Sequence, residues 1–135
     1  MYASGDTKFF AALNRLTGDS IYQHTTKTGT QSSPSVAGGM CYYGDMVGFL
    51  FARDIMTGEV AWSVQVDGSK EDVYEILNTD YTLNGERLYK LSKGGPEKKE
   101  FMDIRFSVGC IISSPVIKDK VIYFGSTDKN FYALQ

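Results

Sequence analysis

The chain has 135 residues, of which 42% are hydrophobic and 22% charged, and its formal net charge is −2. This length accommodates one domain with a hydrophobic core, and the mild negative charge offers no basic surface for nucleic acid or an anionic membrane. No run approaches the roughly 18 apolar residues of a membrane span, and residues 1–6 lack the basic and apolar regions of a signal peptide. We expect no nucleic-acid partner, no transmembrane segment and no signal peptide.

The first predicted repeat covers about residues 2–31 and contains two strands joined by a turn within residues 8–22. Its landmarks are Ala12, Asn14, Thr17, Gly18 and Tyr22. Compared with residues 48–62, the front of this stretch aligns at an offset of 41 and its Thr-Gly pair at an offset of 40. We attribute the one-residue difference to a β-bulge near Ala11 and Ala12.

The second predicted repeat, residues 32–66, carries the most specific motif, A-x-D-x-x-T-G-x-x-x-W. Its landmarks are Ala52, Asp54, Thr57, Gly58 and Trp62. An Asp or Asn at the third position starts a turn by accepting backbone N–H groups two residues on, and the Gly supplies a positive φ. We expect the aromatic residue that ends the motif to fill the space between one sheet and the next. These residues are predicted to stabilise the fold rather than to perform chemistry.

The last predicted repeat, residues 112–135, copies the start of the second at an offset of 81. The segment Ser-Ser-Pro that ends at Pro34 recurs ending at Pro115, and matching Gly and Ala residues follow at equal distances. An offset of 81 is twice the roughly 40-residue period of a four-stranded propeller blade. A degenerate repeat is therefore predicted between the two copies.

This middle repeat is placed at residues 72–106. Its predicted strands are 73–77, 80–83, 87–91 and one that begins at Glu100. Asn84-Gly85 is the strongest two-residue hairpin signal in the chain, and Phe101 would match the aromatic end of the motif. Residues 69–78 are the only stretch where a short helix could compete.

The motif of residues 52–62 resembles the signature of pyrroloquinoline-quinone (PQQ) type propeller repeats, and residues 12–22 repeat it with Asn for Asp and Tyr for Trp. The resemblance implies an all-β fold of four-stranded antiparallel β-propeller blades, with about three and a third repeats in a single segment, residues 1–135. A ring needs about four to eight blades. The chain is therefore expected to be part of a larger propeller, to complete a ring as a homo-oligomer, or to be capped by another protein.

PQQ-dependent dehydrogenases share this repeat, and the resemblance to them would imply a quinone beside a disulfide of adjacent cysteines, a catalytic Asp and calcium. Cys41 and Cys110 are far apart in the sequence and are predicted to be buried in strands, while Asp54 is the turn residue of the motif. His24, the only histidine, is predicted in an exposed loop, and the acidic residues within 67–72 do not have the spacing of a calcium loop. We predict no catalytic, cofactor-binding or metal-binding residues.

Among proteins with such repeats, the chain is similar to the propeller lipoproteins of the bacterial envelope that assist outer-membrane protein assembly. This resemblance favours a non-enzymatic scaffold that binds a protein or peptide, located in the periplasm or at the outer-membrane or extracellular face. The alternative is an accessory propeller of a multidomain enzyme or sensor, such as a phosphoesterase or a kinase ectodomain. A PQQ-dependent dehydrogenase is the third hypothesis, which the cysteine positions disfavour.

Overall fold

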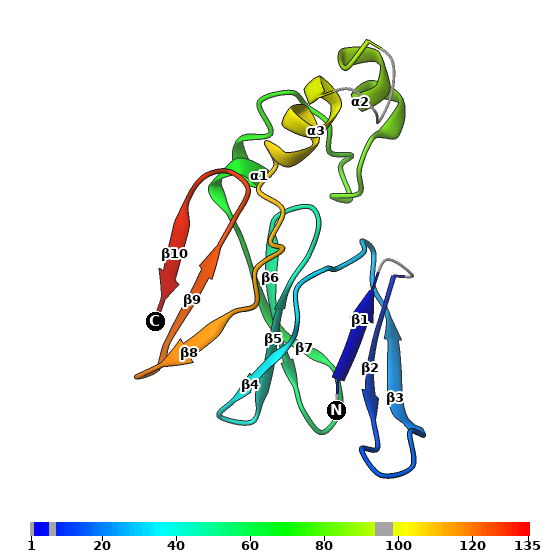
Figure 1. Ribbon diagram of the computed structural model, residues 1–135, viewed down its shortest axis with the longest axis vertical. Coiled ribbons are helices and arrows are strands. Elements are labelled where there is room, and N and C mark those ends of the chain that lie inside the picture. Colours follow the sequence, from blue (N-terminus) through cyan, green and yellow to red (C-terminus); the bar gives the residue numbers. More distant parts are fainter. Residues whose placement is uncertain (1, 6–7, 94–98) are drawn as a thin grey trace.

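The computed structural model describes the backbone of residues 2–5 and all atoms of residues 8–93 and 99–135. In this part of the chain, ten strands form three antiparallel sheets that stand side by side, and three short helices gather at one end of them (Figure 1). Short strands rich in aromatic and other apolar residues, such as β2, β5, β6 and β9, are typical of such sheets when Gly-containing turns separate them.

Each sheet is an up-and-down meander whose strands pair in chain order. The N-terminal sheet consists of β1 (Tyr2–Gly5), β2 (Phe9–Leu13) and β3 (Ser20–Thr25). The central sheet consists of β4 (Ser35–Ala37), β5 (Met40–Gly44), β6 (Phe49–Asp54) and β7 (Val60–Gln65). The C-terminal sheet consists of β8 (Val116–Lys118), β9 (Val121–Gly125) and β10 (Phe131–Leu134). The central sheet is a complete four-stranded blade, which confirms the predicted all-β propeller architecture.

A β-bulge occurs in the first hairpin, where the pairing of β2 with β3 shifts register between Ala12 and Leu13. The pairing of β6 with β7 shifts in the same way between Ala52 and Arg53. Because both hairpins carry the bulge at the same place, the two repeats keep one offset of 40 along their whole length. The expected change of offset from 41 to 40 is therefore wrong, although the bulge itself is present.

The prediction of a middle repeat is wrong: the described residues of 72–93 and 99–106 form helices and loops in place of a blade. This region and its neighbours contain the three helices, α1 (Asp67–Glu71), α2 (Gly85–Leu91) and α3 (Lys99–Phe106). The Asn84-Gly85 pair starts α2 instead of a hairpin, since the Asn84 side chain accepts a hydrogen bond from the Arg87 N–H at 3.0 Å. Asn is as favourable at a helix N-cap as in a turn, which explains the error.

These helices enclose a small core of their own, which packs on the β5–β6 turn through Met46. Its buried members are Ile76, Leu88, Ile104, Val108 and Cys110. We call residues 67–110 the inserted segment. Leu88 points into this core, whereas its neighbour Tyr89 is 58% exposed, as expected for a helix that buries one face. A short helix was considered for residues 69–78, and only residues 69–71 of this range are helical, as the end of α1.

The two copies of the Ser-Ser-Pro motif lie against each other. The Ser32 hydroxyl donates to the Ser113 carbonyl at 2.9 Å, and the Ser35 hydroxyl donates to the Pro115 carbonyl at 2.5 Å. Strands β4 and β8 are therefore neighbours, and the central and C-terminal sheets are adjacent blades (Figure 1). The offset of 81 arises because the inserted segment lies between the two copies in addition to the central blade, so the described residues form parts of three blades.

Substitutions in α2 distinguish the helix from the predicted strand. Leu88→Ala should lower the free energy of unfolding by about 2–4 kcal/mol, because it opens a cavity in the core of the inserted segment. Tyr89→Ala should change it by less than about 1 kcal/mol, because that ring is exposed. Urea denaturation of the two variants measures both values. The opposite order, with Tyr89 the costly position, would show that residues 87–91 are a blade strand.

Candidate functional site

The turn that begins at Asp54 joins β6 to β7. One carboxylate oxygen of Asp54 accepts the N–H groups of Met56 and Thr57 at 2.8 and 3.0 Å. These backbone hydrogen bonds, that of Thr57 first, lower the pKa of Asp54 below its ordinary value. Asn14 makes the same two bonds to residues two and three positions further on, at 2.8 and 3.3 Å. The motif's acidic and amide side chains are thus engaged in equivalent turns.

Gly58 is the point where this turn meets the neighbouring blade. Its φ of +74° favours glycine, and a Cβ on Gly58 would lie 2.4 Å from Tyr22 and 2.7 Å from His24. His24 is therefore not in an exposed loop as predicted: it is a half-buried residue of β3, with Nε2 3.0 Å from the Thr57 carbonyl oxygen. The strand extends to Thr25, and its alternation turns Tyr22 and His24 toward the central sheet.

One apolar position of the repeat packs on the next blade in both interfaces. In the first interface Phe10 is fully buried and stacks on Tyr43, with ring centroids 4.9 Å apart and planes at 16°. In the second, Leu50 occupies the place of Phe10 and lies in one buried cluster with Phe124, the counterpart of Tyr43. The equivalent residue of the C-terminal sheet is Phe131.

The aromatic residues that end the motif are placed differently in the three predicted repeats. Tyr22 is half-buried and its hydroxyl donates to the Ile55 carbonyl of the next blade at 3.2 Å. Trp62 is 39% exposed and lies 5.9 Å from the Tyr42 ring, so it is only partly covered. Phe101 belongs to α3 in the inserted segment and has no place in a blade, because the predicted middle repeat is absent.

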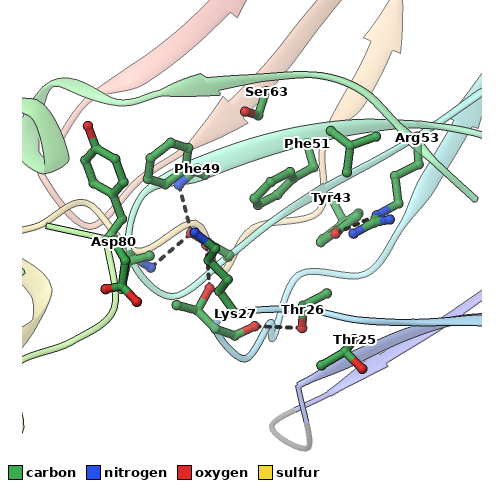
Figure 2. Close-up of a pocket in the computed structure, with 14 residues that line it drawn as sticks. Thr25, Thr26, Lys27, Tyr43, Phe49, Phe51, Arg53, Ser63 and Asp80 are labelled. Atoms are coloured by element: carbon green, nitrogen blue, oxygen red, sulfur yellow. Dashed lines mark hydrogen bonds between the residues drawn. The ribbon is translucent and has the colours of Figure 1, made fainter. Parts of the chain in front are cut away.

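A cavity of about 280 Å³ lies between the N-terminal and central blades (Figure 2). One wall is the face of the central sheet, and the opposite side is the segment 25–28 at the end of β3. Asp80 of the inserted segment lies at one end, and Tyr81 also lines the cavity. The wall of the central sheet is rich in aromatic rings, and the rings of Tyr43 and Phe51 stack at 5.4 Å. We call this cavity the interblade pocket.

Arg53 is the buried charged residue of the interblade pocket, with 6% of its surface exposed. Its Nε donates to the Tyr43 hydroxyl at 2.9 Å and its Nη1 donates to the Gly58 carbonyl at 2.6 Å. The guanidinium carbon lies 5.2 Å from the centroid of the Phe10 ring, a cation–π distance. Burial raises the pKa of Tyr43, and the hydrogen bond from Arg53 opposes that effect.

Asp45 is the buried acidic residue of the interblade pocket. Its carboxylate accepts from the Thr28 hydroxyl at 2.6 Å and from the N–H groups of Val47 and Phe49 at 3.0 and 2.8 Å. Burial raises the pKa of Asp45, while these three hydrogen bonds act in the opposite direction. The carboxylate thus holds the β5–β6 turn and ties it to the segment that follows β3.

Sequence reasoning did not find this pocket, although one signal for it was available. Arg53 stands between the Ala and the Asp of the motif, where the other two repeats have Leu13 and Leu134. A cation at a position that is otherwise aliphatic marks an interface that departs from the repeat. The predicted motif residues are not among those that line the pocket, although Gly58 accepts a hydrogen bond from Arg53 through its carbonyl.

The two cysteines lie in different parts of the structure. Cys41 is buried in β5 beside Phe10 and Tyr43, whereas Cys110 is buried in the inserted segment outside any strand. Burial raises the pKa of the Cys41 thiol to about 11, with the charge of Arg53 opposing, and burial also raises that of Cys110. They do not form the adjacent pair that a quinone site would need, so the residues present do not fit that cofactor.

The acidic side chains near α1 point to separate partners. Asp67 pairs with Lys70 at 3.1 Å, and the two oxygens of Asp72 accept the N–H groups of Ile76 and Leu77 at 2.9 and 2.8 Å. Within residues 8–93 and 99–135, no group of three or more His, Cys, Asp or Glu side chains could hold a metal ion. No helix of the described residues is long and apolar enough to cross a membrane.

Solved structures share this arrangement of blades, while no family model and no curated protein matches the sequence. BamB from Moraxella catarrhalis is 16% identical, with a TM-score of 0.56 over 98% of this chain and 31% of that chain. The computationally designed Ika4 protein is 10% identical, with the same TM-score over 98% of this chain and 57% of that one. A europium-containing methanol dehydrogenase is 22% identical, with a TM-score of 0.47 over 93% of this chain and 14% of that chain.

The fold is that of a β-propeller. The repeat motif and the stacked antiparallel sheets, of which the central one has four strands, agree with this conclusion. The chain spans less than two thirds of the length of each of these structures. The likeness therefore concerns a set of blades within a propeller, and at these identities it describes the fold alone.

The burial of the thiols predicts how they react. Below pH 9 the Cys41 thiol is protonated in both the folded and the unfolded chain, so it makes stability neither rise nor fall with pH. Between about pH 9 and 11 the thiol ionises in the unfolded chain first, so the free energy of unfolding should fall as pH rises through this range.

Because both thiols are buried, iodoacetamide at pH 8 should label the folded chain at least about tenfold more slowly than the chain in urea. Equal labelling rates in the two conditions would contradict the burial of both cysteines.

Proposed function

We propose that this chain is a non-enzymatic part of a β-propeller scaffold that binds protein through an open blade face. The face belongs to the C-terminal sheet and is turned away from the central sheet. Its residues are Val116, Tyr123 and Phe131. The occupant that fits it is another blade-type sheet, contributed by the remainder of the same propeller or by a second copy of the chain.

The observation that carries this proposal is a comparison of equivalent positions. Phe10 and Leu50 each have 0% exposed surface because the next blade covers them. Phe131 holds the same position in the C-terminal sheet, and it is 73% exposed. Its ring stacks on Tyr123 of the same sheet at 6.3 Å, which leaves a flat aromatic surface. Burying such a ring contributes roughly 1.5–3 kcal/mol, which favours association with another sheet.

Trp62 in β7, the edge strand of the central sheet, also supports the proposal that further protein packs on these blades. Tyr22, its equivalent, is covered by the 55–58 turn of the next blade. Trp62 is partly open at the matching place, and a further strand-turn unit beside the C-terminal sheet would cover it. Trp and Tyr are enriched at protein interfaces because they offer a large apolar surface together with a polar atom.

Two carboxylates that could perform chemistry are instead engaged in holding turns. Asp45 holds the β5–β6 turn and Asp54 holds the β6–β7 turn, each through backbone N–H groups. The buried thiols have raised pKa values, which disfavours a nucleophilic thiolate. The resemblance to propeller lipoproteins of the bacterial envelope further supports a periplasmic or outer-membrane location as part of this proposal.

Site-specific crosslinking tests the proposal in the protein as the cell produces it. A photoreactive benzoylphenylalanine placed at Phe131 should form a covalent adduct with protein, and peptide mapping should locate the adduct in a segment with propeller-repeat strands. The same residue placed at Tyr89, an exposed aromatic site on the inserted segment, serves as the matched control. The yield of protein adduct should be several-fold higher at position 131, because a packed sheet holds the probe in contact.

Two results would contradict the proposal. Equal or lower adduct yield at position 131 than at position 89 would show that no protein covers the C-terminal face. Retention of quinone absorbance after incubation with pyrroloquinoline quinone and calcium would contradict the non-enzymatic role.

A further inference from the structure

The guanidinium of Arg53 lacks a compensating negative charge in the described part of the chain. The ion pairs of these residues involve other side chains, and the two hydrogen bonds of Arg53 go to neutral oxygens. The repeat does not need a cation here, since Leu13 and Leu134 fill the equivalent positions. Buried charges in proteins are usually paired, so a residue that is 6% exposed and unpaired calls for a partner.

One end of this guanidinium remains available to a ligand. Arginine has five N–H donors, of which Nε and Nη1 use one each on Tyr43 and Gly58. Nη2 makes no hydrogen bond to the described residues. Because no buried side-chain nitrogen among them is left without a partner, Nη2 must be reached by solvent, and the interblade pocket is the space that Arg53 lines.

The rest of the pocket sets the chemistry of the ligand. The rings of Tyr43, Phe49 and Phe51 provide an apolar, aromatic wall beside Arg53. Asp80 lies at the opposite end, so a negative group is favoured only near Arg53 (Figure 2). The carboxylate of Asp45 already accepts three hydrogen bonds within the protein. The pocket is therefore apolar in its middle and cationic at one end.

We propose that the interblade pocket binds a small organic carboxylate, with the carboxylate on Arg53 and an aromatic or aliphatic body against the wall of rings. A volume of about 280 Å³ admits one such molecule. A planar guanidinium pairs with a carboxylate through charge-assisted hydrogen bonds. The exposed Lys27 also lines the pocket and adds a second positive charge to it. This site is independent of the open face of the C-terminal sheet.

Calorimetry or NMR titration with 3-phenylpropionate tests the proposal, and the neutral 3-phenylpropionamide serves as the matched ligand. We expect the acid to bind at least about tenfold more tightly than the amide, since a charge-assisted hydrogen bond contributes that factor or more. Arg53→Leu should reduce the affinity for the acid to that for the amide. Its fold should be retained, because Leu occupies this position in the other repeats.

Arg15→Leu removes an exposed arginine of the N-terminal blade outside the pocket and should leave the affinity for the acid unchanged. Arg53→Lys keeps the charge without the planar fork and should give an intermediate affinity. Three results would overturn the proposal: equal affinity for acid and amide, unchanged affinity in a folded Arg53→Leu variant, or no binding of the acid at about 10 mM, which corresponds to less than about 3 kcal/mol of binding free energy. The circular dichroism spectrum of each variant establishes that it is folded.

Discussion

Stacking of one apolar side chain on the next sheet is the interaction on which the structure depends. Phe10 on Tyr43 forms the first interface, and Leu50 in a cluster with Phe124 forms the second. The turns of the motif bring the stacked sheets together. Asp54 fixes the turn between β6 and β7, and Gly58 leaves room there for the side chains of the neighbouring blade. Each sheet is covered on both faces only when it has a neighbour on each side, which is why a blade is stable in a series and not alone.

The inserted segment shows how a repeat architecture accepts additional chain without losing its period. It leaves after β7 and returns before β8, so the blades on either side still meet through Ser32 and Ser113. It has a core of its own, which includes Ile76, Leu88 and Ile104 and packs on the β5–β6 turn through Met46. It also brings Asp80 and Tyr81 to the lining of the interblade pocket. The inserted segment thereby completes the interblade pocket, most of which is lined by residues of the blades.

The blades could be predicted from the sequence because the same motif occurs twice, in residues 12–22 and 52–62, and each copy independently indicates the same strand-turn-strand unit. The turn at Asp54 and its copy at Asn14 have the hydrogen bonds that their side chains suggested. The inserted segment was missed because Asn84 serves a hairpin and a helix N-cap equally well, so the local signal is ambiguous. The pocket was missed because the repeat comparison was made on the motif residues and passed over Arg53, which stands where the other repeats have Leu13 and Leu134.

The central claim is that the two copies of the Ser-Ser-Pro motif, 81 residues apart, belong to adjacent blades. Dipolar EPR between spin labels at Val36 in β4 and Val116 in β8, both exposed, tests it most directly. Adjacent blades predict one sheet spacing, about 10 Å plus the label tethers. A separation larger by a further sheet spacing, about 20 Å plus the tethers, would place another blade between the two copies and contradict the account.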